Sequence, residues 1–249
     1  MKSFWICLLC GFLAQMVDGT LGMAYGVSSS TLLRSMGISS AASSFCTHVA
    51  EVFTTLASGI SHLSMKNIDK KLCLRLILPG VLGGVLGAYV LTSVDDSVIS
   101  PVISVYLIVM GAVIFLKAFR KGEKKRRDPG AGVYPLALAG GFSDSLGGGG
   151  WGPVVTSTLI AADCDARTTI GSVNAAEFFV TLAESIAFFA TMGSPGEYLP
   201  AILGLIVGGV AASPLAAYFC KKVPVKTLLA VVGAVIILLN TRKLILALI

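Results

Sequence analysis

The feature that most constrains this chain is a series of long segments that contain no charged side chain and no histidine. Three of them, 76–94, 97–116 and 198–220, match the roughly 20 residues that a helix needs to cross a bilayer. A fourth, 227–241, extends toward residue 249. A chain with several such segments is predicted to be a polytopic helical membrane protein.

Composition narrows the class further. Only 13% of the 249 residues are charged and 55% are hydrophobic, whereas soluble domains average about 25% charged residues. These values exclude an ordinary soluble enzyme, a disordered chain and a nucleic-acid module. The basic run at 117–127 lies between apolar segments, so we expect a loop at a lipid surface and no nucleic-acid partner.

Four further apolar segments are too short for a simple crossing and occur in two pairs. Residues 3–17 pair with 19–33, and residues 130–143 pair with 145–162. A glycine-rich link that contains an aspartate joins each pair, and glycine permits sharp turns of the backbone. Each pair is therefore predicted to form a broken or re-entrant helical hairpin.

The chain also contains an internal repeat, which a shift of 126 residues reveals without a gap from Asp18 to Ala57. A match of rare acidic residues within apolar sequence is hard to obtain by chance. The repeat predicts a first unit at 1–120, a basic cytoplasmic linker at 121–131 and a second unit at 132–249. The aligned pairs include Asp18 with Asp144, Tyr25 with Trp151, Gly26 with Gly152, and Glu51 with Glu177.

Loop charge predicts the orientation of the segments. Basic residues gather near 66–75, 117–127 and 221–226, and the positive-inside rule places these loops in the cytoplasm. The loops at 95–96 and 194–197 lack Lys and Arg and are expected to face outward. Two further segments of similar length, 41–63 and 168–192, carry polar groups and bring each unit to five segments. Because five is an odd number, the second unit must be inverted relative to the first.

The expected fold is therefore all-α. We predict one multi-pass domain over residues 1–249 in the cytoplasmic membrane, with two inverted-topology repeats of about five helical segments each. A broken hairpin opens each repeat, an arrangement that recurs in secondary transporters. A homodimer is one option for its assembly.

The two links are the first candidate site, because helix N-termini with free N–H groups favour anions. Asp18 and Asp144 are read either as helix N-caps or as ligands of a coupling cation. The alternative for the glycines is tight helix packing. The predicted substrate-binding residues are Gly19, Thr20, Gly22, Ser28, Ser29, His48, Gly147, Gly148, Gly149, Gly150, Trp151 and Asn174.

Polar side chains form a stripe along the long helical segment of each unit, at spacings of three and four residues that place them on one face. Burial disfavours a charged carboxylate, so Glu51 and Glu177 are candidates to exchange protons. A structural hydrogen-bond network is the alternative. The predicted coupling residues are Asp18, Glu51, Asp144 and Glu177. The stripes consist of Ser44, His48, Glu51, Thr55, Ser58 and His62 in the first unit, and Asn174, Glu177, Thr181 and Glu184 in the second.

Other chemistries receive less support from the sequence. His48, Glu51 and His62 lie on one helix and cannot readily surround one ion, so we expect no fixed metal and no cofactor. A membrane-embedded hydrolase that uses Ser143, Asp144 and His48 is one alternative, although G-x-S-x-G is absent. An anion channel is a second alternative. Arg34 and Arg167, near segment ends, are expected to extend toward the interface.

A set of glycine-containing and acidic motifs follows in order along the chain: Gly11, Asp18–Gly22, His48–Phe53, Pro79–Gly84, 141–153 and Asn174–Glu177. In the order and duplication of these motifs, the whole chain resembles the TauE/SafE family of sulfite exporters. The resemblance implies a transporter, not an enzyme, for small sulfur-containing or organic anions such as sulfite, sulfoacetate and other sulfonates. Four carboxyls beside such an anion would repel it unless protonated or paired with cations, so we expect coupling to protons or, less favoured, sodium.

Overall fold

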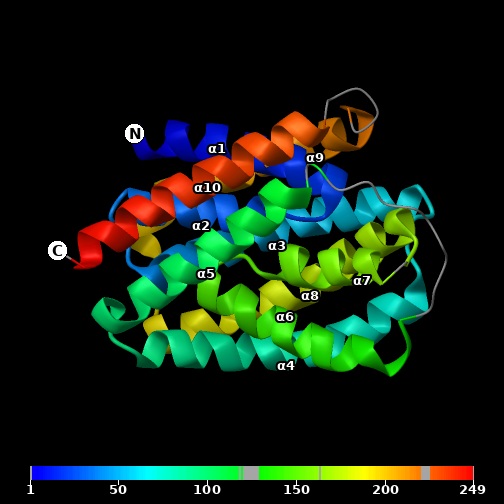
Figure 1. Cartoon of the computed structure of the whole chain (residues 1–249), viewed down its shortest axis with the longest axis horizontal. Coiled ribbons are helices and arrows are strands. Elements are labelled where there is room, and N and C mark those ends of the chain that lie inside the picture. Colours follow the sequence, from blue (N-terminus) through cyan, green and yellow to red (C-terminus); the bar gives the residue numbers. More distant parts are fainter. Residues whose placement is uncertain (1, 118, 120–128, 163, 220–224, 249) are drawn as a thin grey trace.

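The computed structural model describes residues 2–117, 119, 129–162, 164–219 and 225–248, and these are almost entirely helical. Figure 1 shows long helices that run side by side along one axis. The first half contains α1 (Lys2–Leu21), α2 (Tyr25–Ser35), α3 (Ser40–Ser64), α4 (Lys70–Ser93) and α5 (Asp96–Lys117). The second half contains α6 (Val133–Gly147), the π-helical turn η2 (Gly152–Thr156), α7 (Ser157–Ala161), α8 (Ala166–Met192), α9 (Leu199–Phe219) and α10 (Val225–Leu248), with short 3-10 turns at Gly130–Gly132 and Gly196–Tyr198.

Four helical stretches in the described part of the chain are long and apolar enough to cross a membrane: Lys70–Ser93, Asp96–Leu116, Arg167–Met192 and Gly196–Ala216. They correspond to four of the segments expected from the sequence. Many large apolar side chains are exposed around the bundle, among them Leu78 and Leu238. Such a surface suits lipid rather than water. The all-helical, multi-pass membrane class is therefore confirmed.

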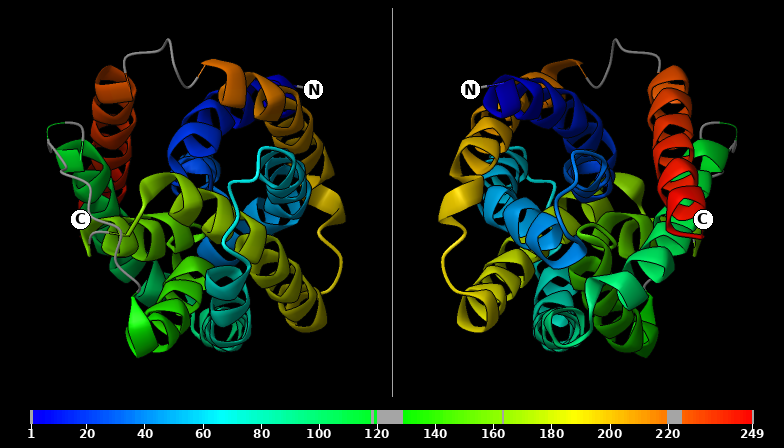
Figure 2. Two further views of the ribbon diagram at one scale, coloured as in Figure 1. Left: turned by 90° about the vertical axis from the view of Figure 1, so that its right-hand side faces the viewer. Right: turned by 90° about the vertical axis from the view of Figure 1, so that its left-hand side faces the viewer.

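The pairing of helices is reciprocal between the two halves. α1 packs along α9, α4 along α6, α3 along α8 and α5 along α10, so each of these pairs joins one half to the other. The two end-on views in Figure 2 show α5 beside α10 on one flank, with α1 and α9 together elsewhere on the rim. The repeat matches α1 with α6, α3 with α8, α4 with α9 and α5 with α10. Exchanging each helix for its match gives the same set of pairs. The inversion of one half relative to the other in a membrane stays a prediction.

Glycines allow the closest of these helix pairs to form. A Cβ on Gly83 of α4 would overlap the carbonyl oxygen of Leu138 in α6, and a Cβ on Gly208 of α9 would overlap that of Leu8 in α1. Small residues at such positions let helix backbones approach closely in membranes. The packing role considered for the glycines is correct for Gly83 and also for Gly87, which lies against Phe142.

The connections between helices divide between the two ends of the bundle. In Figure 1 the α3–α4 turn lies at the right-hand end, and the α4–α5 turn and the α8–α9 connection lie at the left-hand end. The basic loop near residues 66–75 and the two loops without Lys or Arg are thus at opposite ends, as the orientation from loop charge requires. Most of the predicted linker at 121–131 lies outside the described residues.

The side chain of Arg34 is buried and connects the short helix α2 to its neighbours by hydrogen bonds. The expectation that this side chain extends toward the interface is therefore wrong. Its guanidinium is 2% exposed and donates to the hydroxyls of Ser100 and Ser104 on α5, each at 3.0 Å, and to Asn240 Oδ1 on α10 at 3.2 Å. Lys243 Nζ donates to the carbonyl oxygen of Arg34 at 3.2 Å. A cation suits this carbonyl at the helix C-terminus.

Candidate functional site

Two breaks in the helical backbone lie against each other. Gly22–Ala24 separates α1 from α2, and Gly148–Gly150 separates α6 from the turn that contains Pro153. Gly149 has a φ of 152°. A Cβ added to Gly26 would lie 2.6 Å from the Cα atom of Gly149. Non-glycine residues rarely adopt such backbone conformations or allow such contacts. The two glycine links are therefore in direct contact.

Asp18 and Asp144 cap the helices that follow these breaks. Asp18 lies in the last turn of α1, and its Oδ1 atom accepts from the Tyr25 N–H at 3.4 Å. Asp144 lies in the last turn of α6, and its Oδ1 atom accepts from the Gly150 N–H at 2.5 Å and the Trp151 N–H at 3.0 Å. Each aspartate thus reaches the residue seven positions on, so the repeat seen in the sequence is also a repeat of hydrogen bonding.

The polar stripes of α3 and α8 face the interior. Glu51 and Glu177 are both buried, at 2% and 6% exposure. One turn later on each helix, Thr55 and Thr181 donate to the carbonyl oxygens of these glutamates, at 2.5 Å and 2.9 Å. The spacing argument therefore identified the correct face on both helices.

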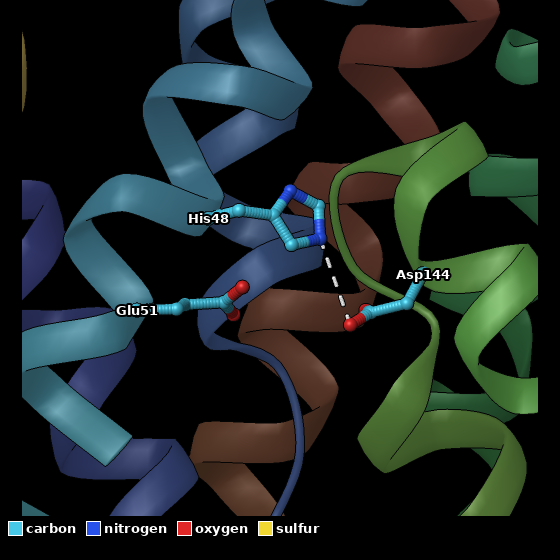
Figure 3. A group of neighbouring side chains, drawn as sticks. All are labelled: His48, Glu51 and Asp144. Carbon is cyan, nitrogen blue, oxygen red and sulfur yellow. Dashed lines mark ion pairs between the residues drawn. The ribbon is translucent and has the colours of Figure 1, made fainter. Parts of the chain in front are cut away.

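His48 on α3 joins the two halves of the molecule. Its Nδ1 atom lies 2.6 Å from the carbonyl oxygen of Ser44, and its Nε2 atom forms an ion pair with Glu184 on α8 at 2.8 Å. The same Nε2 atom lies 3.6 Å from Asp144 Oδ2. Figure 3 shows His48 and Asp144 facing each other, with the carboxyl group of Glu51 directed toward the same space.

Glu184 belongs to the predicted stripe but was not among the predicted coupling residues. The 126-residue shift aligns it with Ser58, so a search for matched acidic residues passes over it. Its helical spacing from Glu177 was the available signal, because a residue seven positions later returns to the same face. Its contact with His48 became visible only once α3 and α8 were placed together.

The counterpart of the His48 position is less charged. The shift aligns His48 with Asn174, whose Nδ2 atom donates to the carbonyl oxygen of Ile170 at 3.1 Å. Ile170 is in turn the counterpart of Ser44, so the local contact repeats. The amide of Asn174 and the hydroxyl of Ser58 thus occupy the positions that the repeat relates to the imidazole of His48 and the carboxyl of Glu184.

Several predicted binding residues pack against other helices instead of facing an open space. A Cβ on Gly19 would lie 2.8 Å from Ala216 Cβ, and Gly147 lies against the ring of Tyr106. Trp151 is fully buried in an apolar cluster and donates from Nε1 to the carbonyl oxygen of Val173 at 3.2 Å. The side chain of Thr20 lies outside the described residues.

Other predicted residues present buried polar atoms that have no hydrogen-bond partner in the described structure. These atoms are the hydroxyl oxygens of Ser28 and Ser29, Oδ1 of Asn174, Oε2 of Glu51, and Nε2 of His48 and Oδ2 of Asp144, the last two of which have ion-pair contacts only. A buried polar group without a partner is costly, and it normally finds water, an ion or a ligand. These atoms are therefore available to a bound solute.

A cavity of about 380 Å³ lies between α1, α2 and α10. Its lining is almost wholly apolar, with Leu13 and Val235 among the lining residues, and Ser28 and Thr31 contribute hydroxyls. The Thr31 hydroxyl already accepts from Asn240 Nδ2 at 3.0 Å. Such a lining suits hydrocarbon and offers little to a small anion.

The group formed by His48, Glu51 and Asp144 has the spacing of a metal site, since one donor atom from each lies within 4.8 Å of the others. Nε2 of His48 also lies 2.8 Å from Oε2 of Glu184, so a fourth ionisable group, from α8, adjoins these three side chains. We describe His48 and Glu184 as a buried ion pair flanked by the carboxyls of Glu51 and Asp144.

The fold and site define a multi-pass helical membrane protein with ionisable residues at its core, which is the class of membrane transporters. The family model for sulfite exporter TauE/SafE matches residues 7–242, and the chain belongs to this family. It is also similar to the probable membrane transporter protein YtnM of Bacillus subtilis (strain 168). The two chains are 37% identical over 251 residues, which cover 98% of this chain and 84% of the relative. No solved structure matches the chain.

Proposed function

We propose that this membrane transporter is a secondary active transporter of small sulfur-containing anions, with sulfite, sulfoacetate and related sulfonates as the substrate class. Membership of the sulfite exporter family supports this class of substrate. The observation at the site that favours it is the unpartnered hydroxyl group of Ser29, which follows the first glycine link. Neutral hydrogen-bonding groups and backbone N–H groups suit an oxyanion in a low-dielectric site.

The substrate would bind between the two links and the polar faces of α3 and α8. Ser29 from the first half and Asn174 from the second would supply polar contacts, whereas Ser28 faces the apolar cavity between α1, α2 and α10. His48 would provide the nearest positive charge when it is protonated. Relative movement of the two halves would then open the site to each side of the membrane in turn, as in other transporters built from repeats.

Coupling to a cation follows from the charge of the site. Asp18, Glu51, Asp144 and Glu177 are all buried, and together they would repel an anion if all were ionised. Proton binding removes this repulsion without requiring space for another ion. We therefore propose that the coupling ion is a proton, with sodium as the alternative.

The experiment is uptake of radiolabelled sulfite and sulfoacetate into proteoliposomes that contain the purified protein. A transporter gives saturable uptake and counterflow, in which unlabelled solute inside the vesicle drives entry of label. An anion channel gives neither. If no tested sulfonate, sulfite or carboxylate undergoes counterflow, the proposed function is wrong.

A further inference from the structure

The contact between His48 and Glu184 contains a proton whose position can be derived from geometry. A carbonyl oxygen can only accept, so the 2.6 Å approach to the Ser44 carbonyl places a hydrogen on Nδ1 of His48. Nε2 then lies 2.8 Å from Oε2 of Glu184. Without a proton on one of these two atoms, two lone pairs would face each other at that distance. The pair therefore holds one proton in either of two forms, imidazolium with carboxylate or imidazole with carboxylic acid.

The groups around this pair make the proton hard to lose. Asp144 Oδ2 on α6 lies 3.6 Å from Nε2, and Glu51 on α3 has a buried oxygen without a partner. From α4, Gly84 packs against this pair, and a Cβ added to Gly84 would lie 2.7 Å from Cγ of Glu184. The ring of Phe188 on α8 lies 5.8 Å from the imidazole, centroid to centroid. Loss of the proton would leave several carboxylates facing one another, an arrangement that is costly in a low-dielectric interior.

Asp144 connects this pair to the second glycine link. Its Oδ2 atom faces His48, and its Oδ1 atom accepts from the N–H groups of Gly150 and Trp151. A change of charge at His48 therefore acts on the same carboxylate that caps the helix after the link. Proton binding and the position of the link are thus joined through one side chain.

The repeat relates this pair to a second position between the halves that has no equivalent charge. Asn174 and Ser58 occupy it, and neither an amide nor a hydroxyl exchanges its charge state at physiological pH. The two halves are alike in the aspartate caps and in Glu51 and Glu177, but the two related positions differ here. A transporter built from two similar halves would then carry this proton at only one of two related positions.

We propose that His48 and Glu184 form the proton-binding site of this transporter, with one proton shared between His48 Nε2 and Glu184 Oε2. This inference rests on the proposed function and specifies the residues that carry the coupling ion. On release from the imidazolium form, the N–H bond breaks, its electron pair remains on Nε2, and the proton passes to water on the open side of the membrane. Glu184 is left as a carboxylate beside a neutral imidazole.

The test compares two transport assays in proteoliposomes with radiolabelled sulfite. Counterflow at equal pH requires no net proton movement, whereas accumulation driven by an imposed pH gradient does. E184Q is expected to keep counterflow and to lose gradient-driven accumulation, down to the level of protein-free vesicles, whereas H48Q also removes the positive charge beside the substrate and is expected to lose both. T191A is the matched control on α8, because the Thr191 hydroxyl donates to carbonyls of its own helix, and it is expected to keep both activities. Gradient-driven accumulation by E184Q at the wild-type level would overturn the proposal, whereas absence of counterflow in the wild-type protein would refute the proposed function instead.

A spectroscopic measurement tests the proton site without any transport. The chain has two histidines, so the H62N variant labelled with nitrogen-15 histidine reports on His48 alone. Solid-state NMR is expected to show hydrogen on Nδ1 at every pH and a pH-dependent Nε2 signal that E184Q alters. An Nε2 signal that is the same with and without Glu184 would contradict the proposal. If E184Q does not fold, E184D retains the acid with a shorter side chain and is expected to weaken gradient-driven accumulation while counterflow remains.

Discussion

Nε2 of His48 lies 2.8 Å from Oε2 of Glu184, and neither side chain is exposed. His48 belongs to α3 in the first half and Glu184 to α8 in the second, so this ion pair crosses between the two repeated halves. Its net energy depends on the balance between desolvation and attraction, but removing one partner alone leaves a buried charge uncompensated. The pair is therefore a point where stability and proton binding can be measured on the same residues.

The stability losses of the two single substitutions in this pair are expected to sum to more than the loss in the double variant. H48Q and E184Q should each lower the free energy of unfolding by about 3–5 kcal/mol, as for other broken buried pairs. The double variant should be more stable than additivity predicts by about 0.5–3 kcal/mol. Unfolding in mixed detergent micelles measures all four proteins, with T191A as the control that should stay close to wild type. Strictly additive losses would mean that the two side chains do not interact.

The two aspartate caps are expected to differ in strength. Asp144 accepts two hydrogen bonds, at 2.5 Å and 3.0 Å, whereas Asp18 accepts one at 3.4 Å. D144A should therefore destabilise the protein by about 2 kcal/mol or more and D18A by about 0.5–1 kcal/mol, within the range of helix caps. Thermal unfolding of the purified variants checks the order, which equal losses or the reverse order would contradict. D144N retains an acceptor and should fall between D144A and wild type.

Contact between the two links is expected to require glycine at position 149. Gly149 has a φ of 152°, and a Cβ there would overlap the backbone at Gly26 and Val27. G149A should therefore be strongly destabilised or fail to fold, because neither the conformation nor the space allows a side chain. G132A is the matched control, since no atom lies within 4 Å of its added Cβ. Yield and size-exclusion profile measure both variants, and a well-folded G149A would show that the links separate readily.

The anchor of α2 is expected to be a major source of local stability. R34M would remove the hydrogen bonds to Ser100, Ser104 and Asn240 and leave these buried groups unpaired. We expect a loss of about 2–4 kcal/mol, because hydrogen bonds to charged groups are strong and their unmet partners are costly. K243M, which removes the hydrogen bond to the Arg34 carbonyl, should lose about 1 kcal/mol. Hydrogen exchange should show faster exchange in α2 for R34M, and unchanged exchange there would contradict this role.

Much of the fold was predictable because its determinants are local. A bilayer requires long apolar helices, so the segments at 76–94 and 97–116 appear directly in the sequence. The glycine links were recognisable because glycine runs disfavour an unbroken helix. Asp144 and Tyr25 were identified through the repeat, and their hydrogen bonds confirmed the correspondence. Arg34 was misjudged, because a position near a segment end does not reveal that α5 and α10 enclose it.

The sequence by itself determined the membrane class, the two matched halves and the face of each helix that carries polar groups. Helical periodicity places His48 and Glu184 on polar faces, but it contains no information about which face meets which. Only the tertiary structure decided that His48 pairs with Glu184 rather than with Glu177, the acid that the repeat matches to Glu51. The physical reason is that contacts between helices depend on their close packing and not on the local pattern around either residue. Glycines that are far away in the sequence, such as Gly84, permit this packing.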